Sequence, residues 1–199
     1  DGSFAVVGSW RDNSSVDGLG DSGAIHIINL SNGNVTTIEN PNNFGTLTFD
    51  RFGRSVDIKN GRIIVGATGE DTATNTEVGV AYIYDFDINT STWSLSATVE
   101  HPDAATNDQF GAEVAVADNY YAVASIQKNT GSGVVYVFDA TDNTLLKTLE
   151  NPNLFGTSDN DNFGTAMSAH EDYLTISTPA EDNAGGNNSG ALYIYKTGI

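Results

Sequence analysis

Carboxylates dominate the side chains of this sequence that could do chemistry. Of its 199 residues, 26 are Asp or Glu, 8 are Lys or Arg, and none is Cys. Disulfides, thiolate metal sites and cysteine nucleophiles are therefore excluded. Many of the carboxylates fall in Gly- and Asn-rich segments that are typical of loops, where they could bind a cation or a partner. The loop residues that we expect to contact a ligand are Asp12, Asp17, Asp21, Glu70, Asp71, Lys128, Glu181 and Asp182.

Calcium is the ion that such carboxylates would favour, because Ca²⁺ takes several hard oxygen ligands. Asp12, Asp17 and Asp21 share one segment, and Asp17 followed by glycine resembles part of a calcium loop. These aspartates lack the regular spacing of such a loop, and adjacent acidic pairs elsewhere are typical of solvated charge. We therefore expect no metal site and no bound cofactor, with calcium at the first segment as the alternative.

The sequence offers little support for catalysis. Its three histidines, His26, His101 and His170, are scattered. No Ser lies in a G-x-S-x-G elbow, and there is no H-E-x-x-H motif. Paired carboxylates could support glycoside hydrolysis, but among 26 acids some pair will always fit that description. We expect that the protein is not an enzyme.

The overall charge limits the partners. A net charge of −18 repels the phosphates of nucleic acids and of anionic lipids. No apolar run approaches the roughly 18–20 residues that cross a bilayer. We expect no nucleic-acid partner and no membrane insertion. Because 39% of the residues are apolar and 10% are aromatic, a packed core is expected despite the charge.

An internal repeat determines the elements that position these loops. The strings DRFG, DQFG and DNFG begin at Asp50, Asp108 and Asp161, which are 58 and 53 residues apart. A second set of related strings is led by glycine and rich in aromatic residues. Its members begin at Gly23, Gly79, Gly133 and Gly190. Two markers with one shared period of about 55 residues indicate a repeat protein.

Each repeat predicts four short strands, which we letter a to d. Short runs rich in Val, Ile and Tyr, bounded by Gly, Asn and Asp, are strand signals. Strands a lie at 54–58, 112–116 and 165–169, strands b at 4–9, 62–68, 121–125 and 173–178, strands c begin at the four glycines above, and strands d lie at 34–39, 92–100 and 144–150. Hairpin turns are expected at Asn60-Gly61 and Asn32-Gly33.

Repeats of this length and content predict an all-β fold, a β-propeller built from four-stranded antiparallel blades. A β-solenoid or a flat meander is the alternative. In a propeller the phenylalanine of each DxFG string would pack between blades, and the glycine would permit close backbone approach. These repeat positions are Phe52, Gly53, Phe110, Gly111, Phe163 and Gly164.

The chain is expected to form a single propeller segment over residues 1–199. Its repeats span 1–49, 50–107, 108–160 and 161–199, and the first and last are partial. The first lacks strand a and the last lacks strand d, which leaves fourteen strands. We therefore expect only part of a complete ring, whose sheet edges are completed by further blades or by a neighbouring chain.

The order D-x-F-G, apolar strand, V-G-A, acidic loop, S-G-x-x-Y-x-F/Y resembles the FG-GAP repeat family over nearly the whole chain. This family includes the N-terminal propeller of integrin α chains, although residues 144–153, TLLKTLENPN, are more similar to bacterial FG-GAP-like arrays. The resemblance implies an extracellular propeller used for binding. The family's D-x-D-x-D-G calcium loop between strands a and b has no match in DIKNGR at 57–62, so that metal site does not carry over.

Loops are where binding residues usually lie on a rigid scaffold. In an up-and-down meander the b–c and d–a loops share one face, and the b–c loops are the longest here. We expect a non-enzymatic binding or adhesion module on the extracellular, cell or virion surface, with a protein or glycan ligand at that face. The alternatives are a structural subunit of a filament, fibre or virion appendage, and a non-catalytic part of a larger secreted enzyme.

Overall fold

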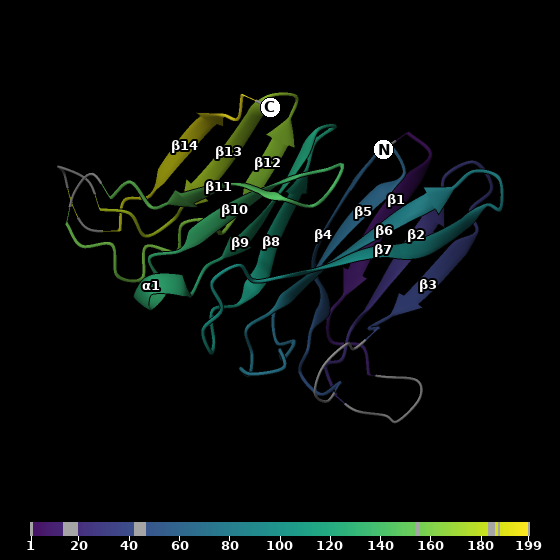
Figure 1. Ribbon diagram of the computed structural model, residues 1–199, viewed down its shortest axis with the longest axis horizontal. Helices are drawn as coiled ribbons and strands as arrows, with labels where there is room; N and C mark the ends of the chain where they lie inside the picture. The colour runs from purple at the N-terminus through teal and green to yellow at the C-terminus, as the bar shows by residue number, and fades with distance from the viewer. Residues whose placement is uncertain are drawn as a thin grey trace.

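The computed structural model describes residues 2–13, 20–41, 47–153, 156–182, 186 and 188–198. Over these residues the chain forms four antiparallel sheets, two of three strands and two of four. The sheets follow one another along the longest axis of the molecule as a fan of blades, and they do not close into a ring (Figure 1). The fold is thus an all-β propeller that is open in the described part of the chain, as the repeats predict.

The strands of each blade lie side by side in chain order. Blade 1 contains β1 (Phe4–Ser9), β2 (Ala24–Asn29) and β3 (Val35–Glu39). Blade 2 contains β4 (Phe52–Lys59), β5 (Arg62–Ala67), β6 (Val80–Asp87) and β7 (Thr92–Glu100). Blade 3 contains β8 (Phe110–Val116), β9 (Tyr120–Ser125), β10 (Val134–Asp139) and β11 (Leu145–Glu150). Blade 4 contains β12 (Met167–His170), β13 (Tyr173–Thr178) and β14 (Ala191–Lys196).

The phenylalanine of each DxFG string lies between two consecutive blades, as expected. Phe52, Phe110 and Phe163 are fully buried. Phe52 belongs to one apolar cluster with Ile25 of blade 1 and Tyr82 of blade 2, and its ring meets the Tyr82 ring edge-on at 5.6 Å. Burying a side chain of this size stabilises the fold by roughly 2–3 kcal/mol, so these residues fasten each blade to the preceding one.

The glycine after each phenylalanine is required by both conformation and space. Gly53, Gly111 and Gly164 have φ of 82°, 88° and 96°, a region that side chains disfavour. A Cβ on Gly53 would lie 2.6 Å from the Ala24 carbonyl oxygen, and one on Gly111 would lie 2.9 Å from Gly66 Cα. Strand a therefore begins in direct backbone contact with the preceding blade, and only glycine fits there.

Three local features differ from the prediction. β4 and β8 begin at the phenylalanines themselves, before a break in the strand register, two residues earlier than expected. β12 begins at Met167, two residues later than expected. The b–c loop of blade 3 contains a four-residue helical turn, α1 (Lys128–Gly131), where Asn129 and Thr130 have positive φ. These features depend on turn geometry and strand register that a pattern of apolar residues does not reveal. Among the described residues, no helix is long and apolar enough to cross a membrane.

Candidate functional site

The b–c loop of each blade is joined to the d–a loop that follows it. The phenylalanine N–H groups donate to carbonyls of the preceding b–c loop: Phe52 to Ser22 at 3.0 Å, Phe110 to Val78 at 2.8 Å, and Phe163 to Ser132 at 2.9 Å. The same bond thus recurs at all three junctions. The two classes of loop form one continuous face, as expected, which we call the loop face.

The aspartate that begins each DxFG string is buried beneath this face. Asp50, Asp108 and Asp161 are 1%, 5% and 3% exposed. Asn40 Nδ2 donates to Asp50 at 2.8 Å, and Asn151 Nδ2 donates to Asp161 at the same distance. Each amide belongs to the residue that directly follows a strand d. We call Asp50, Asp108 and Asp161 the junction aspartates, because each ties a d–a loop to a blade junction.

A second buried carboxyl faces the first junction aspartate. Glu70 is fully buried and hydrogen-bonds to Asp50. Burial, and then the charge of Glu70, raise the pKa of Asp50 to about 8, while the Asn40 amide opposes this shift. Since two such carboxyls do not both ionise readily at short range, they share a proton near neutral pH. Burial likewise raises the pKa of Asp161, which lies below the loop that carries Glu181.

Lys128 takes the place of this second carboxyl at the middle junction. Its Nζ lies 3.1 Å from Asp108 Oδ2 and 3.3 Å from Asp103 Oδ2, and its side chain is 11% exposed. His101 replaces the asparagine amide, with Nε2 3.4 Å from Asp108 Oδ2. Burial lowers the pKa of His101 to about 4, so the ring is neutral at physiological pH. The middle junction is thus a buried ion pair rather than a carboxyl pair.

His101, Asp108 and Ser125 do not form a proton relay. In a catalytic triad, serine and aspartate contact different nitrogens of the imidazole. Here both Ser125 Oγ, at 3.2 Å, and Asp108 lie at Nε2, and Nδ1 accepts the Asp103 N–H at 3.0 Å. The Ser125 hydroxyl is fully buried and donates to the Asp108 carbonyl at 2.7 Å. This geometry stabilises the junction and leaves no nucleophile for a substrate.

The second residue of each adjacent acidic pair, Glu70-Asp71 and Glu181-Asp182, forms a hydrogen bond within its own loop. Asp71 Oδ1 accepts the Glu77 N–H at 3.0 Å, and Asp182 Oδ1 accepts the Asn188 N–H at 2.9 Å. Glu181, like Glu70, is buried beneath the loop. The structure therefore distributes these predicted residues over separate junctions and does not gather them into one site.

The first loop holds the remaining predicted residues. The Asp12 carboxylate lies 3.6 Å from His26 Nε2, and the Asp21 carbonyl accepts the Arg51 N–H at 3.0 Å. Asp17 lies outside the described residues. Within the described part of the chain, no three His, Asp or Glu side chains are arranged to hold a metal ion. The expectation of no metal site, with calcium at Asp12, Asp17 and Asp21 as the alternative, stays a prediction.

Comparison with known proteins identifies the repeat. The family model described as "FG-GAP repeat" matches residues 46–84, 93–138 and 156–195, which is more than half of the chain. The chain belongs to the FG-GAP repeat family. Among solved structures, it is similar to the β-propeller domain of the Trilobed protease from Pyrococcus furiosus, described as having an open velcro topology, with a TM-score of 0.43 and 14% identity. That match covers 87% of this chain and 46% of the other. No curated protein matches the chain.

One hollow on the loop face of this FG-GAP chain was not expected from the sequence. It has a volume of about 260 Å³ and lies where the loops of blades 1 to 3 meet. Arg11 Cζ lies 4.4 Å from the centre of the Trp10 ring, and Arg54 Cζ lies 5.8 Å from it. The residues that line it are Trp10, Arg11, Asp21, Arg51, Arg54, Thr68 and Gln109. We call it the Trp10 pocket.

The Trp10 pocket concentrates positive charge on an acidic molecule. Three of the four arginines of the sequence line it. Among the described residues, none of these three guanidinium groups lies within 4.0 Å of a carboxylate oxygen, whereas the fourth, Arg62, pairs with Asp85 at 2.7 Å. A signal was present in the sequence, because these arginines fall within residues 11–54 of a chain with a net charge of −18.

Proposed function

We propose that this FG-GAP propeller is a non-enzymatic recognition module of the extracellular or cell surface, with its binding site at the Trp10 pocket of the loop face. The observation that carries the proposal is a pocket lined by Trp10 and three arginines, of which Arg11 and Arg54 lie 4.4 and 5.8 Å from the centre of the Trp10 ring. Asp21 also lines this pocket, but among the described residues none of the three guanidinium groups lies within 4.0 Å of a carboxylate oxygen. Holding like charges together costs free energy unless a ligand neutralises them. FG-GAP repeats are typical of extracellular binding proteins, which supports this location.

The ligand of such a pocket carries an anionic group. Guanidinium groups bind carboxylates and sulfates through paired hydrogen bonds, and the Trp10 ring offers an apolar surface beside them. The ligand is therefore a protein or a glycan that presents an acidic side chain or a sulfate. Because the rest of the molecule is acidic, the pocket would also orient such a ligand toward the loop face.

The test measures the binding of two anionic probes by calorimetry at low salt. The probes are a sulfated heparin tetrasaccharide and a hexaglutamate peptide. We expect at least one probe to bind, and the double change Arg51→Gln with Arg54→Gln to weaken it at least tenfold. Lys196→Gln, a cation on the exposed face of β14, is the matched control and should change nothing. Two outcomes would contradict the proposal: that neither probe binds, or that the double Arg51→Gln, Arg54→Gln variant binds a probe as tightly as the original protein does.

A structural role as a subunit of a fibre is the second candidate, and one observation favours it. On β14, Leu192 and Ile194 are 64% and 65% exposed. Their counterparts in β6, Ala81 and Ile83, are fully buried against blade 3. An exposed apolar face of this kind promotes association.

Light scattering after size exclusion distinguishes this second candidate. Concentration-dependent oligomers that Ile194→Lys abolishes, while Lys59→Gln at the end of β4 leaves them unchanged, would support a structural subunit. A monomer of 21.0 kDa at all concentrations would exclude assembly through this face.

A further inference from the structure

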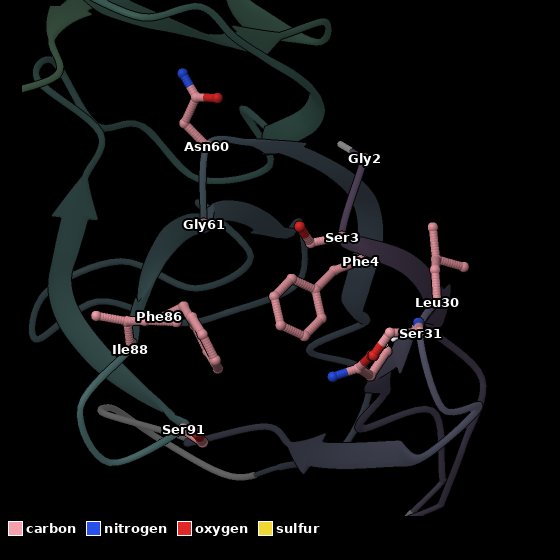
Figure 2. Close-up of a pocket in the computed structure, with 11 residues that line it drawn as sticks. Gly2, Ser3, Phe4, Leu30, Ser31, Asn60, Gly61, Phe86, Ile88 and Ser91 are labelled. Atoms are coloured by element: carbon pink, nitrogen blue, oxygen red, sulfur yellow. Dashed lines mark hydrogen bonds between the residues drawn. The ribbon is translucent and has the colours of Figure 1, made fainter.

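A groove opens between blades 1 and 2 on the face opposite the loop face. Figure 2 shows it bounded by the start of β1 and by two turns, the Asn60-Gly61 turn and the turn after β2 that carries Leu30 and Ser31. Its volume is about 660 Å³, within the range of small-molecule sites. A second hollow of about 260 Å³ continues it and shares Phe4, Asn29, Phe86 and Ser91. We call the two together the aromatic groove.

Three aromatic rings form the floor of the groove. The Phe4 ring lies 4.8 Å from the Phe86 ring and 5.2 Å from the Trp93 ring, and Phe86 and Trp93 are also 5.2 Å apart. Phe4 is 9% exposed, whereas Phe86 and Trp93 are half-buried and present part of their rings to the groove. The β6–β7 hairpin supplies the last two, because its pairing continues to Asp87 and Thr92.

The blade fold itself does not require this set of residues. Strand register matches the Phe4–Asn29 pair of blade 1 with the Arg62–Asp85 pair of blade 2. At the next junction, Arg62 binds both the Asp85 carboxylate and the Ala140 carbonyl, and a charged hollow of only 190 Å³ remains. In addition, the position of blade 3 that is equivalent to Phe86 of blade 2 is occupied by Ala140. An equivalent blade therefore forms without the aromatic floor, so packing alone does not explain it.

The lining of the groove is polar but uncharged. Of the residues described there, none carries a charge, although 17% of the sequence does. Amides and hydroxyls surround the rings instead. These side chains belong to Ser3, Asn29, Ser31, Asn32, Asn34, Thr36, Asn60 and Ser91. Because amides and hydroxyls both donate and accept hydrogen bonds, the groove suits a neutral ligand that is rich in hydroxyls.

We propose that the aromatic groove is a second binding site, which takes a neutral oligosaccharide. The C–H face of a pyranose ring packs on exposed aromatic rings, here Phe86 and Trp93, while its hydroxyls exchange hydrogen bonds with the surrounding amides. A proline-rich peptide also packs on aromatic rings, but it offers few N–H donors to the hydroxyls and amides of the lining. The Oδ1 atoms of Asn29 and Asn32 already accept the Ser31 and Asn34 N–H groups, so the hydroxyls and the remaining amide groups would receive the ligand. This site is independent of the Trp10 pocket in position and in ligand charge.

The experiment uses Trp93 as its own reporter. The sequence contains two tryptophans, so in Trp10→Phe all tryptophan fluorescence comes from Trp93. Cellotetraose, xylotetraose, mannotetraose and chitotetraose are titrated to about 10 mM, since weak glycan sites have millimolar constants. We expect a saturable fluorescence change with at least one of them. Heparin tetrasaccharide serves as a charged comparison and should have no effect on Trp93.

Two substitutions locate the site, each made in the Trp10→Phe background. Phe86→Ala should weaken binding at least tenfold, and circular dichroism reports whether the fold survives. Ser91→Glu alters an exposed residue and places a charge in the groove, so it should also weaken binding. Tyr173→Ala, which removes an aromatic ring that is 48% exposed on blade 4, is the matched control. No response to any of the four sugars, unchanged binding in both groove variants, or a response to decaproline alone would overturn the proposal.

Discussion

Lys128 shows how one residue changes the chemistry of a repeat. It stands where Glu70 and Glu181 stand in the neighbouring repeats, and it gives Asp108 a cation at 3.1 Å. At the first junction the corresponding partner is a carboxyl, and burial together with the charge of Glu70 raises the pKa of Asp50 to about 8. Two junctions with the same backbone therefore differ in the charge of the group that faces the aspartate.

The contribution of Asp50 to stability should fall as the pH rises from about 4 to about 8, while His101, whose pKa burial lowers from 6.5 to about 4, contributes in the opposite direction between those two values. The folded chain holds the Asp50 proton up to a pKa of about 8, whereas the unfolded chain releases it near 3.8. Between these values the folded state binds more protons at Asp50, so the Asp50 contribution to the free energy of unfolding falls with rising pH. Urea unfolding at several pH values measures this slope, and Asp50→Asn should flatten it.

Asp87→Asn is the matched control for Asp50→Asn. Asp87 is exposed, and hydrogen bonds from Asn89 lower its pKa below 3.8, so its titration lies outside this pH window. A slope that both substitutions change equally, or that Asp50→Asn leaves unchanged, would show that the Asp50–Glu70 pair does not hold a proton.

Removing the Lys128 amine should destabilise the middle junction. Lys128→Met keeps the length of the side chain but leaves the buried Asp108 carboxylate without its cation, which costs about 3 kcal/mol. Adding Asp108→Asn to Lys128→Met should recover most of this loss, because no buried charge then remains. A double-mutant cycle by urea unfolding measures the coupling, and additive effects of the two substitutions would contradict the ion pair.

The sequence was sufficient to predict that the strands exist and insufficient to predict the residue at which some of them begin. Runs such as 62–68 and 173–178 predict β5 and β13 closely, because short runs rich in Val, Ile and Tyr that end at Gly, Asn or Asp are typical of strands. The start of β4 at Phe52 depends on contact with blade 1, which lies far away in sequence. Contacts of this kind leave no local signal.

The same reasoning applies to the predicted site. Grouping the b–c and d–a loops on one face needed only the meander, and the structure confirms it. The structure buries Glu70 and Lys128 at the blade junctions, which the sequence did not indicate, and their contact with a ligand stays a prediction. The Trp10 pocket was missed because Arg51 and Arg54 approach Trp10 only after blade 2 packs on blade 1.

Glycine at the start of strand a can be tested with a matched pair. Gly111→Ala combines an unfavourable φ of 88° with a Cβ that would lie 2.9 Å from Gly66 Cα. Gly33 has a similar φ of 76°, but a Cβ added there would contact nothing within 4 Å. Gly33→Ala should therefore lower the free energy of unfolding by only about 1 kcal/mol. We expect Gly111→Ala to cost roughly 3 kcal/mol or more by urea unfolding. If both substitutions lowered the free energy of unfolding equally, the close backbone contact between blades would not be the reason that glycine is required at position 111.

The net charge of −18 opposes folding. Mutual repulsion among exposed carboxylates is screened by salt over a Debye length of about 8 Å at 0.15 M. We expect the melting temperature to rise as sodium chloride is added up to that concentration. Calcium chloride at equal ionic strength should raise it no further, and a specific effect of millimolar calcium would instead show that the protein binds this ion.

The apolar core is divided into three clusters, and each cluster joins only consecutive blades. Blades 2 and 3 take part in two clusters each, whereas blades 1 and 4 take part in one. Stability in such an arrangement is the sum of nearest-neighbour terms, so the terminal blades can open while the central pair stays folded. Backbone amides of β5, β6, β9 and β10 should therefore exchange with deuterium most slowly, and exchange should quicken stepwise toward both ends of the fan.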